Sequence, residues 1–575
     1  MQALDILKKY WGYNTFRLKQ EEVINSVLKS KDTLALLPTA GGKSICFQVP
    51  ALMKDGICLV ISPLISLMED QIKYLKSKGI KSVSISSSMS NKDIQTALTN
   101  CLYGGIKFLY LSPEKLRDQL IKEKINQMNL NLIAVDEAHC ISDWGHNFRP
   151  SYRLISEIRD TKENIPILAL TATANKLVVD DIQNNLNFKE KNLIKSTFLR
   201  KNLSYVAVDC SSKKNTLLAL LNKFKSSVII YVSSRKESNE ITLFLKDNNI
   251  SSTSYHAGIE FKKRIKIQEE WTNNLTRVIV ATNAFGLGIN KEDIRLIIHM
   301  QIPMNMESYY QEAGRAGRDG KTAYSFILYD KLDFKKNINN LNIWYPKIES
   351  IRNIYQKICD YLQIAIHELP DEDFQFNISN FCNRYNLDIK QTFIIINFLE
   401  KEELIKLYDS KNIKSKIKII ISNSELYKFQ IANSYYDNFI KILLRNYSNI
   451  YNNFVNIEEK KIEKQLNIKT QSVRDILLKL EQNGVIKYKQ NEVGMQLRFL
   501  QNRKDSEKLN ISEEKILNEK KLAKEKLDII IKYINNKKKC RSQNILKYFG
   551  EEIHERCNIC DNCIAEKKKN LKDLK

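Results

Sequence analysis

Residues 132–139 read LIAVDEAH, a short apolar run that ends in two adjacent carboxylates, Asp136 and Glu137. An uninterrupted run of this kind predicts a strand buried on both faces, which is typical of a parallel sheet covered by helices. Side chains that follow such a strand lie at the edge where parallel sheets bind their ligands. We therefore expect Asp136 to hold Mg²⁺ and Glu137 to orient and deprotonate a water, a solvated acidic turn being the alternative.

The same pattern continues on both sides of this stretch. From residue 33 to about 335, short β-branched runs alternate with amphipathic segments of about 10 to 15 residues, which predicts parallel sheets flanked by helices. The predicted class is α/β, with two tandem parallel-sheet domains. The other strand candidates are TLALL (33–37), ICLVIS (57–62), ILALTAT (167–173), SVIIYVS (227–233) and RVIVAT (277–282).

Residues 38–44, PTAGGKS, follow the first of these strands. The two glycines let backbone N–H groups converge on phosphate oxygens, Lys43 would neutralise the β and γ phosphates, and the Ser44 hydroxyl would ligate Mg²⁺. Leu37 stands where the usual pattern has its first glycine, so the motif alone could be an ordinary turn. Together with the two acids it predicts a nucleotide site. The loop residues assigned to it are Thr39, Gly41, Gly42, Lys43 and Ser44.

The later half of the α/β region ends in ESYYQEAGRAGRDG, residues 307–320. Arg315 and Arg318 lie on one face if this segment is helical, and could reach across a domain cleft to a γ-phosphate. Gln311 is assigned to the same site. A surface salt-bridge face is the alternative, although three glycines make a poor autonomous helix.

The length of the chain indicates the number of domains, and its net charge indicates the class of partner. The 575 residues predict three to five domains at about 150 residues each. Lys+Arg 91 against Asp+Glu 66 gives a net charge of +25, which indicates a polyanionic partner such as nucleic acid or an anionic membrane surface. An AT-rich coding bias is the alternative. The N-terminal residues lack the features of a secretory signal, and no apolar run approaches the roughly 20 residues of a membrane span, so we expect a cytoplasmic protein.

These motifs resemble superfamily 2 helicases, and longer stretches resemble the RecQ DNA helicase family over residues 5 to 335. In that family WGYNTFRLKQEEVI would read adenine, which implies Tyr13 and Arg17 on the two faces of the base and Gln20 on its edge. Ala40 departs from the family, which usually has glycine there. The further matching segments are ISPLISLMEDQ (61–71), YLSPEKL (110–116), ALTATA (169–174), IIYVSSRKESNEI (229–241), YHAGIE (255–260) and ATNAFGLGINKEDIR (281–295).

The segment HCISDWGHNFRPSY, residues 139–152, is similar to the family's aromatic-rich loop, which couples single-stranded DNA to ATP hydrolysis. Aromatic faces stack on bases without reading sequence, at about 1 to 3 kcal/mol per base, and Arg149 can engage phosphate. The alternative is that Trp144 and Phe148 are core aromatics. His146 belongs to the same assignment. The resemblance also implies DNA contacts at strand ends, any of which could be a turn or capping residue: Ser62, Ser112, Thr173, Ser233, Arg235 and Thr282.

After residue 340 the sequence becomes helical and rich in Lys, Asn and Ile. Residues 377–408 predict helix, turn, helix and a short strand, and residues 455–500 predict a second such unit ending in a hairpin, VIKYKQNEVGMQLRF (485–499). This resembles a winged helix, which RecQ proteins use to meet duplex DNA at a fork. Winged helices also bind other proteins, so contact with DNA and contact with a protein both remain possible for this region.

Four cysteines cluster near the C-terminus, in a spacing that suits tetrahedral Zn²⁺: Cys540, Cys557, Cys560 and Cys563. Disulfides are the alternative. The segment resembles the RecQ zinc module, but here it follows the winged-helix region instead of preceding it. We expect the helix at 512–536 to bring it back onto the second parallel-sheet domain, and no helical accessory domain after it.

The predicted domains are 1–205 and 206–340 for the two sheets, 341–440 and 441–505 for winged-helix-like units, and 506–575 for a helix with the zinc module.

The resemblance implies an ATP-, Mg²⁺- and Zn²⁺-dependent DNA helicase that moves 3′ to 5′ on single-stranded DNA in recombination and repair. It would be a monomer, with single-stranded and forked duplex DNA and repair proteins as its partners. The alternatives are a translocase that remodels protein–DNA complexes without unwinding, an RNA helicase, and a scaffold that lost the motor.

Overall fold

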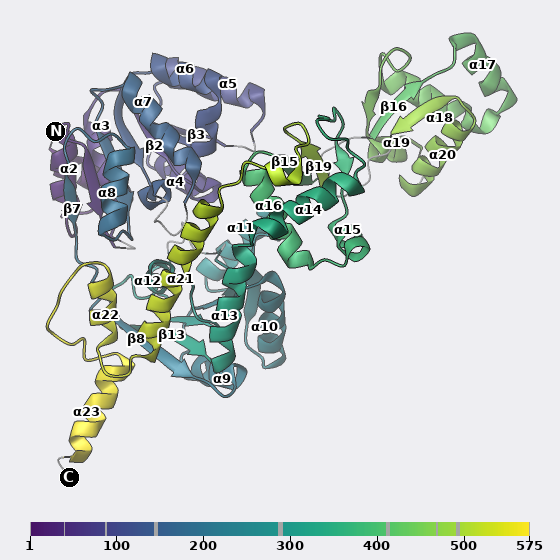
Figure 1. Cartoon of the computed structure of the whole chain (residues 1–575). Coiled ribbons are helices and arrows are strands. Elements are labelled where there is room, and N and C mark those ends of the chain that lie inside the picture. Colours follow the sequence, from purple (N-terminus) through teal and green to yellow (C-terminus); the bar gives the residue numbers. More distant parts are fainter. Residues whose placement is uncertain are drawn as a thin grey trace. The chain divides into compact units, whose positions relative to one another are not determined.

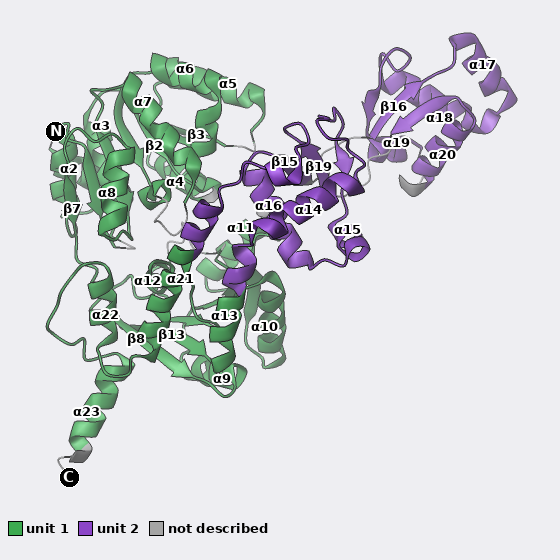
Figure 2. Ribbon diagram, viewed as in Figure 1, with its two compact units in different colours: residues 1–339, 521–575 green, residues 340–520 purple. Residues whose placement is uncertain are grey.

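Figure 1 shows the computed structural model of the chain, which describes residues 2–38, 41–86, 89–142, 148–283, 285, 291–409, 415–466, 470–489 and 495–573. The chain forms two compact units (Figure 2): residues 1–339 with 521–575, and residues 340–520. Among the described residues, no helix combines the length and apolar character that crossing a bilayer requires.

The first sheet of unit 1 has seven described strands in the order β3-β4-β2-β5-β6-β1-β7, and all neighbours run parallel. Its central strands are wholly buried, as the uninterrupted apolar runs predict. The strands are β1 (Thr33–Leu36), β2 (Ile57–Ile61), β3 (Ser82–Ile85), β4 (Phe108–Leu111), β5 (Leu130–Val135), β6 (Ile167–Thr171) and β7 (Leu193–Lys195). The helices are α1 (Ala3–Trp11), α2 (Gln20–Leu28), α3 (Lys43–Met53), α4 (Ile65–Ser77), α5 (Asn91–Tyr103), α6 (Gln119–Gln127), α7 (Ile155–Thr161) and α8 (Lys176–Asn185).

The second sheet of unit 1 has six described strands, again all parallel, in the order β10-β11-β9-β12-β13-β8. The strands are β8 (Leu203–Asp209), β9 (Val228–Tyr231), β10 (Ser252–Tyr255), β11 (Val278–Ala281), β12 (Leu296–His299) and β13 (Ala323–Tyr329). The helices are α9 (Lys213–Lys223), α10 (Arg235–Asp247), α11 (Phe261–Thr272), α12 (Met306–Ala313) and α13 (Lys331–Trp344). The two parallel sheets confirm the predicted α/β class.

The C-terminal module packs on β8, the edge strand of the second sheet. It comprises the end of α21 (Glu513–Asn535), α22 (Arg541–Tyr548) and α23 (Asp561–Asp573). Ser204 Oγ donates to Ile559 O at 2.6 Å, and the Ala207 N–H donates to Asp561 Oδ2 at 3.1 Å. An edge strand leaves backbone groups unpaired, and here Asp561 of the module accepts from one of them, the Ala207 N–H. The expected return of this module to the second sheet domain is confirmed.

Unit 2 contains a winged-helix arrangement with a three-stranded antiparallel sheet, β14-β19-β15. Its core includes Phe381, Ile395, Leu497 and Phe499. Its elements are α14 (Ile348–Tyr361), β14 (Phe374–Gln375), α15 (Ile378–Tyr385), α16 (Ile389–Lys401), β15 (Ile405–Asp409) and β19 (Met495–Phe499). We call this part the host domain.

A second domain is inserted between β15 and β19 and has its own sheet, β17-β16-β18. Its elements are β16 (Ser415–Ile419), α17 (Asn423–Ala432), α18 (Ser434–Asn446), β17 (Val455–Ile457), α19 (Glu459–Leu466), α20 (Thr470–Gln482) and β18 (Ile486–Lys489). We call it the inserted domain. The two winged-helix-like units are therefore nested, whereas the sequence predicted one after the other.

The predicted hairpin over residues 485–499 is wrong. β18 pairs with β16, whereas β19 pairs with β14 and β15. The reason is that the two strands face different cores: Ile486 and Tyr488 are buried in the inserted domain, and Leu497 and Phe499 in the host domain. Alternation along one strand shows which side chains turn inward, but not which partner strand shares that core.

The inserted domain leaves and rejoins the host domain at neighbouring positions. Asp409 is paired with Met495 at the end of β15, and Lys416 with Lys489 near the start of β16. Removing the insertion should therefore cost the host little, because a short turn can join the paired strands.

We predict that replacing residues 410–494 with an Asn-Gly turn leaves the host domain folded. Its thermal unfolding midpoint should shift by no more than about 4 °C, which corresponds to about 1 kcal/mol. Amide exchange at Leu497 and Ile395 would follow this core directly. A deletion of residues 410–499, which also removes β19, is the control and should abolish protection. Fast exchange in the Asn-Gly variant would contradict the nested arrangement.

Candidate functional site

The loop before α3 is shaped by two glycines and one buried glutamine. Gly42 caps α3 with φ +69°, and a Cβ there would lie 2.3 Å from Gln20 Nε2. The Gln20 amide donates to the carbonyl oxygens of Gly41 at 3.0 Å and Gly42 at 3.1 Å. Gln20 therefore fixes the loop that the sequence assigns to phosphate, a contact that the sequence did not predict. Its expected contact with a base edge stays a prediction.

The two acids lie directly after β5, at the carboxyl edge of the first sheet. Lys43, which begins α3, donates from Nζ to Glu137 Oε1 at 3.5 Å. Glu137 has φ +48°, a left-handed conformation that is costly for a residue with a side chain and recurs at functional sites. The fold thus brings together the loop lysine and the acid that the sequence assigned to one site.

Asp136 has the properties of a ligand for a hard cation. Burial, with the neighbouring Glu137 charge, raises the pKa of Asp136 to about 6, and Lys43 opposes that shift. A divalent cation would favour the carboxylate, since a bound cation is the largest local charge. Tyr152 holds the backbone here by donating its hydroxyl to the Asp136 carbonyl at 2.9 Å. Asp136 and the Ser44 hydroxyl supply the oxygen donors that Mg²⁺ prefers.

His139 connects the acids to the end of β6. Its Nδ1 lies 2.9 Å from Thr171 Oγ1 and 3.3 Å from Glu137 Oε2. Burial, together with the Lys43 charge, lowers the pKa of His139 to about 3, so the imidazole is neutral at physiological pH. The Thr173 N–H donates to Thr171 Oγ1 at 3.2 Å. Sequence reasoning missed this chain of contacts, although both the DEAH and the ALTATA segments contain its members.

Arg315 and Arg318 lie outside a helix, because α12 ends at Ala313 and both arginines lie in the turns that follow. The condition under which they would share one helix face is therefore not met. Gly317 there has φ +63°, and a Cβ on it would lie 2.6 Å from Asn202 Nδ2. Arg200 holds these turns in place. Its guanidinium donates to the carbonyl oxygens of Gly314, Ala316 and Gly317 at 2.9 to 3.1 Å.

These arginines form a cationic cluster at the second sheet. Arg315 is buried, and burial together with Arg315 and Arg200 lowers the pKa of Arg318 to about 9. Arg318 remains charged at neutral pH. Gln311, on α12, is also buried. Closely placed cations repel one another, so this cluster favours an anionic ligand.

The expected base-binding residues lie in contact with each other. The Arg17 guanidinium is 5.4 Å from the centroid of the Tyr13 ring, and Tyr13 is half exposed. A base between the two side chains would have to replace this cation–π contact. Their assignment to adenine stays a prediction.

Two expected DNA contacts have hydroxyls that the fold does not use. Ser62, after β2, and Thr173, after β6, are buried, and within the described part of the chain their Oγ atoms have no hydrogen-bond partner. Buried hydroxyls normally have one, so a ligand would satisfy them. Trp144, His146 and Thr39 lie outside the described residues.

A cavity of about 590 Å³ opens beside β2 and β4, and Ser112 and Arg149 contribute to its lining. Arg149 Nη1 donates to Glu114 Oε1 at 3.2 Å, an exposed pair that a phosphate could replace. Phe148 is half-buried under the Arg153 guanidinium, 5.1 Å from its ring centroid.

On the second sheet domain, the three expected DNA contacts have different surroundings. Ser233 donates to Glu237 at 2.8 Å, Arg235 is exposed next to Gly258, and Thr282 is buried. Their contact with nucleic acid stays a prediction.

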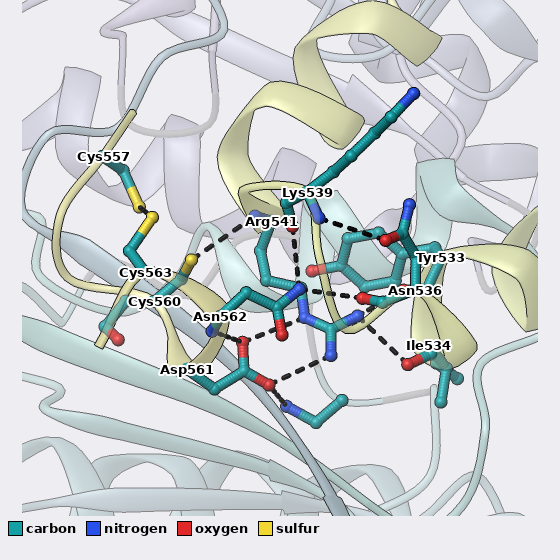
Figure 3. A network of polar contacts seen from close by, with 12 residues as sticks. Tyr533, Ile534, Asn536, Lys539, Arg541, Cys557, Cys560, Asp561, Asn562 and Cys563 are labelled. Carbon is teal, nitrogen blue, oxygen red and sulfur yellow. Dashed lines mark hydrogen bonds and ion pairs between the residues drawn. The ribbon is translucent and has the colours of Figure 1, made fainter. Parts of the chain in front are cut away.

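The four C-terminal cysteines converge, and their Sγ atoms all lie within 4.8 Å of one another. Figure 3 shows three of them, Cys557, Cys560 and Cys563. Four sulfur donors at this separation fit a structural Zn²⁺. Two backbone N–H groups also donate to sulfur, Arg541 to Cys560 Sγ and Cys557 to Cys540 Sγ, both at 3.4 Å. Such bonds stabilise thiolate ligands.

A buried ion pair joins this cluster to the second sheet (Figure 3). The Arg541 guanidinium donates to both carboxylate oxygens of Asp561 at 3.0 Å, and also to the carbonyl oxygens of Tyr533 and Ile534. Asp561 follows Cys560 directly and accepts from Ala207 in β8. One carboxylate therefore links the cysteine cluster, the end of α21 and the edge strand.

Two tandem parallel-sheet domains, with a phosphate-type loop and paired acids on the first and buried arginines on the second, define the class of two-domain nucleotide-dependent motor proteins. Family comparisons agree with the fold. The DEAD/DEAH box helicase family matches residues 17–182 and the helicase conserved C-terminal domain matches 212–320. The RecQ helicase winged-helix domain of Bacteroidota matches 417–490, and the RecQ zinc-binding family matches 495–564.

The ATP-dependent DNA helicase RecQ of Haemophilus influenzae is 41% identical over 58% of this chain and 54% of its own length. The probable ATP-dependent DNA helicase RecS of Bacillus subtilis is 40% identical over 57% of this chain and 67% of its own. The chain belongs to the RecQ helicase family. It spans about half the length of several curated relatives that it matches. The structure of Mss116p bound to ssRNA and AMP-PNP shares the fold, with a TM-score of 0.50 at 15% identity over 76% of this chain and 93% of the other.

We predict that Asp561→Asn loosens the C-terminal module, because it leaves the buried Arg541 charge without its partner. Removing one member of a buried pair costs about 3 to 5 kcal/mol, and we expect about 2 here because the Asp561 side chain is 22% exposed. Release of Zn²⁺ to a chelator and proteolysis within residues 521–575 should both accelerate. Glu566→Gln, which breaks the exposed pair with Arg556, is the matched control and should change neither rate. Equal rates in the two variants would show that the buried pair does not hold the module.

Proposed function

We propose that this chain is an ATP- and Mg²⁺-dependent helicase that unwinds duplex DNA by moving 3′ to 5′ along one strand, and that it serves recombination and repair. The observation that supports ATP hydrolysis most directly is the 3.5 Å contact between Lys43 and Glu137. Membership of the RecQ family supports DNA as the substrate, and polarity and pathway rest on that membership alone.

In the proposed reaction, Lys43 binds the β and γ phosphates and Glu137 accepts a proton from the attacking water. The water oxygen forms a bond to the γ-phosphorus as the bond from that phosphorus to the β–γ bridging oxygen breaks. The bridging oxygen keeps the electron pair and leaves as part of ADP. Lys43 already lies beside Glu137, so a bound phosphate would exchange one anionic partner of the lysine for another.

Asp136 and Ser44 would hold Mg²⁺, which neutralises phosphate charge when bound. Arg315 and Arg318 would stabilise the charge that develops on the γ-phosphoryl group, with Gln311 beside them. Arg200 positions these arginines by holding the backbone on both sides of Arg315.

Coupling between a bound DNA strand and the ATP site would run along the carboxyl edge of the first sheet. Thr173, a candidate DNA contact, is hydrogen-bonded to Thr171, which contacts His139, which in turn contacts Glu137. Single-stranded DNA bound at Thr173 and Ser62 would therefore move the Glu137 carboxylate, which activates water. Arg149 and Phe148 would contribute phosphate and stacking contacts.

Zn²⁺ would be held by the four cysteines and would supply a fixed crosslink between the start of α22 and the start of α23 with the loop before it. Single-stranded and forked DNA would be the partners, together with repair proteins. We further propose a cytoplasmic, nucleoid-associated monomer, in agreement with the net charge of +25.

We predict that Glu137→Gln lowers the rate of DNA-stimulated ATP hydrolysis by about 10²- to 10⁴-fold, the usual contribution of a general base, while ATP binding is kept. Lys43→Ala should weaken ATP binding as well. Glu157→Gln removes an exposed carboxylate paired with Lys122 and serves as the matched control, with hydrolysis unchanged. Near-normal turnover by Glu137→Gln would exclude this carboxylate as the base.

We predict unwinding of a 3′-tailed DNA duplex, and not of a 5′-tailed DNA duplex or a 3′-tailed RNA duplex, with Lys43→Ala as the inactive control. A gel or fluorescence assay that separates the strands measures this directly. ATP hydrolysis stimulated by DNA without strand separation would favour a translocase that remodels protein–DNA complexes. Opening of the RNA duplex would favour an RNA helicase.

A further inference from the structure

The two sheets of unit 1 are joined directly by a short segment, residues 196–202, which runs from β7 to β8. We call it the interdomain linker. It is held on two sides, by the turns that contain Arg315 and Arg318 and by the end of α22 in the C-terminal module. The second set of contacts is remote in sequence, since Thr197 and Glu551 are 354 residues apart.

The first set of contacts ties the turns of the two arginines to the linker. Arg200 donates to three carbonyl oxygens in residues 314–317, and Asn202 Nδ2 donates to two carbonyl oxygens in residues 317–321, at 2.7 and 2.8 Å. Hydrogen bonds from a charged donor are roughly twice as strong as neutral ones. The backbone path of these turns therefore depends on the position of the linker.

The second set of contacts ties the linker to the end of α22. Glu551 Oε2 accepts hydrogen bonds from the Phe198 N–H at 3.0 Å and from the Thr197 hydroxyl at 3.2 Å. The Phe549 carbonyl oxygen accepts from Lys195 Nζ, at the end of β7, at 3.0 Å. Two acceptors of the C-terminal module therefore hold the start of the linker.

Three buried aromatic rings join the linker, α12 and α22. Phe198 stacks on Phe549, with ring centroids 4.5 Å apart and an angle of 16° between the ring planes. Tyr310, in the last turn of α12, packs edge-on against Phe198 and donates its hydroxyl to the Phe198 carbonyl at 2.8 Å. Aromatic pairs of this kind stabilise a contact beyond the area that they bury. The cluster therefore also reaches the start of the turns after α12.

The turn that presents Glu551 has a defined geometry. Gly550 has φ +70°, and its N–H donates to the Lys547 carbonyl at 3.1 Å. The Glu551 N–H donates to the Leu546 carbonyl at 2.8 Å. These two bonds form a Schellman motif, which ends a helix with its last carbonyl groups satisfied. The Glu551 carboxylate is therefore placed by α22.

We propose that Phe549 and Glu551 are positioning residues for ATP hydrolysis. They hold the interdomain linker, and the linker holds the turns of the two arginines through Arg200 and Asn202. The inference rests on the proposed function, which assigns these arginines to the γ-phosphate. It gives the C-terminal module an effect on the chemical step without any contact between the module and the nucleotide.

The test uses three variants of the full chain. Glu551→Ala removes both hydrogen bonds to the linker. Glu551→Gln keeps a carbonyl oxygen that can accept both bonds, since each carbonyl oxygen has two lone pairs, so this variant should restore the behaviour of the unaltered chain. Glu552→Ala removes the same charge from the exposed neighbouring residue and is the matched control.

The kinetic measurement is ATP hydrolysis stimulated by single-stranded DNA. Glu551→Ala should lower kcat by about 10- to 100-fold, because a misplacement of about 1 Å from a remote mutation can cost about 10²-fold. Its KM for ATP should be unchanged, as for the loss of an interaction made only in the transition state. Equal kcat values for Glu551→Ala and Glu552→Ala would overturn the proposal, and so would a Glu551→Gln variant as slow as Glu551→Ala.

The zinc content of each purified variant separates positioning from loss of the module. It should be equal in all three variants and in the unaltered chain. Loss of zinc from Glu551→Ala in proportion to its loss of kcat would make the role of Glu551 structural and would contradict the proposal.

A double-mutant cycle tests the route through the linker. Arg200→Ala should lower kcat by itself, and Glu551→Ala in that background should lower it little further, because both residues act on the same turns. Losses that multiply in the double variant would show that Glu551 acts by another route.

Amide hydrogen exchange at residues 314–317 gives a measurement that needs no hydrolysis. Exchange should accelerate in Glu551→Ala and should match the unaltered chain in Glu551→Gln and Glu552→Ala. If the unaltered chain hydrolyses no ATP, the proposed function fails while this comparison still stands. Unchanged exchange in Glu551→Ala would refute the link between the module and the turns of the arginines.

Discussion

The level parallel register of β5, β6 and β1 is the constraint on which the candidate site depends. Ile133 pairs with Ile167, and Leu36 pairs with Thr171, so the three strands end near one another at the carboxyl edge. Lys43 and Glu137 are 94 residues apart in sequence, yet they are in contact because each follows a strand of this set. The pairing of these strands therefore brings Lys43 and Glu137 close to Asp136 and His139, whose pKa values are shifted by burial and by these charges.

The second sheet uses its edge strand for a different purpose. β8 has no strand on its outer side in the described part of the chain, and the C-terminal module occupies that position through Ser204 and Ala207. A polar loop with cysteines could not cover an edge strand by apolar burial alone. The Arg541–Asp561 pair and the cysteine cluster supply the order that a hydrophobic core would otherwise provide.

The features that the sequence predicted well are local. Strands buried on both faces appear as continuous apolar runs, and their ends mark the ligand edge, so the placement of Lys43, Asp136 and Glu137 followed directly. The wrong hairpin came from a choice between distant partners, because the pattern of β18 and β19 is the same whether they pair with each other or with other strands. The sequence left helix or turn open at Arg315, and the turns found there depend on Arg200, more than a hundred residues earlier. The Gln20 contact to the glycine loop is likewise set by packing and has no signature in the sequence.

The nested arrangement in unit 2 also limits the distance between the inserted domain and the host domain. Asp409 pairs with Met495 in the host domain and Lys416 pairs with Lys489 in the inserted domain, so the two domains are joined twice, at neighbouring positions. Two covalent connections keep the domains close, so a ligand held by one domain meets the other at a high effective concentration. Binding that would be weak for the isolated inserted domain thereby becomes an intramolecular event for the host domain. Avidity is therefore a property of this topology, whatever ligand the two parts share.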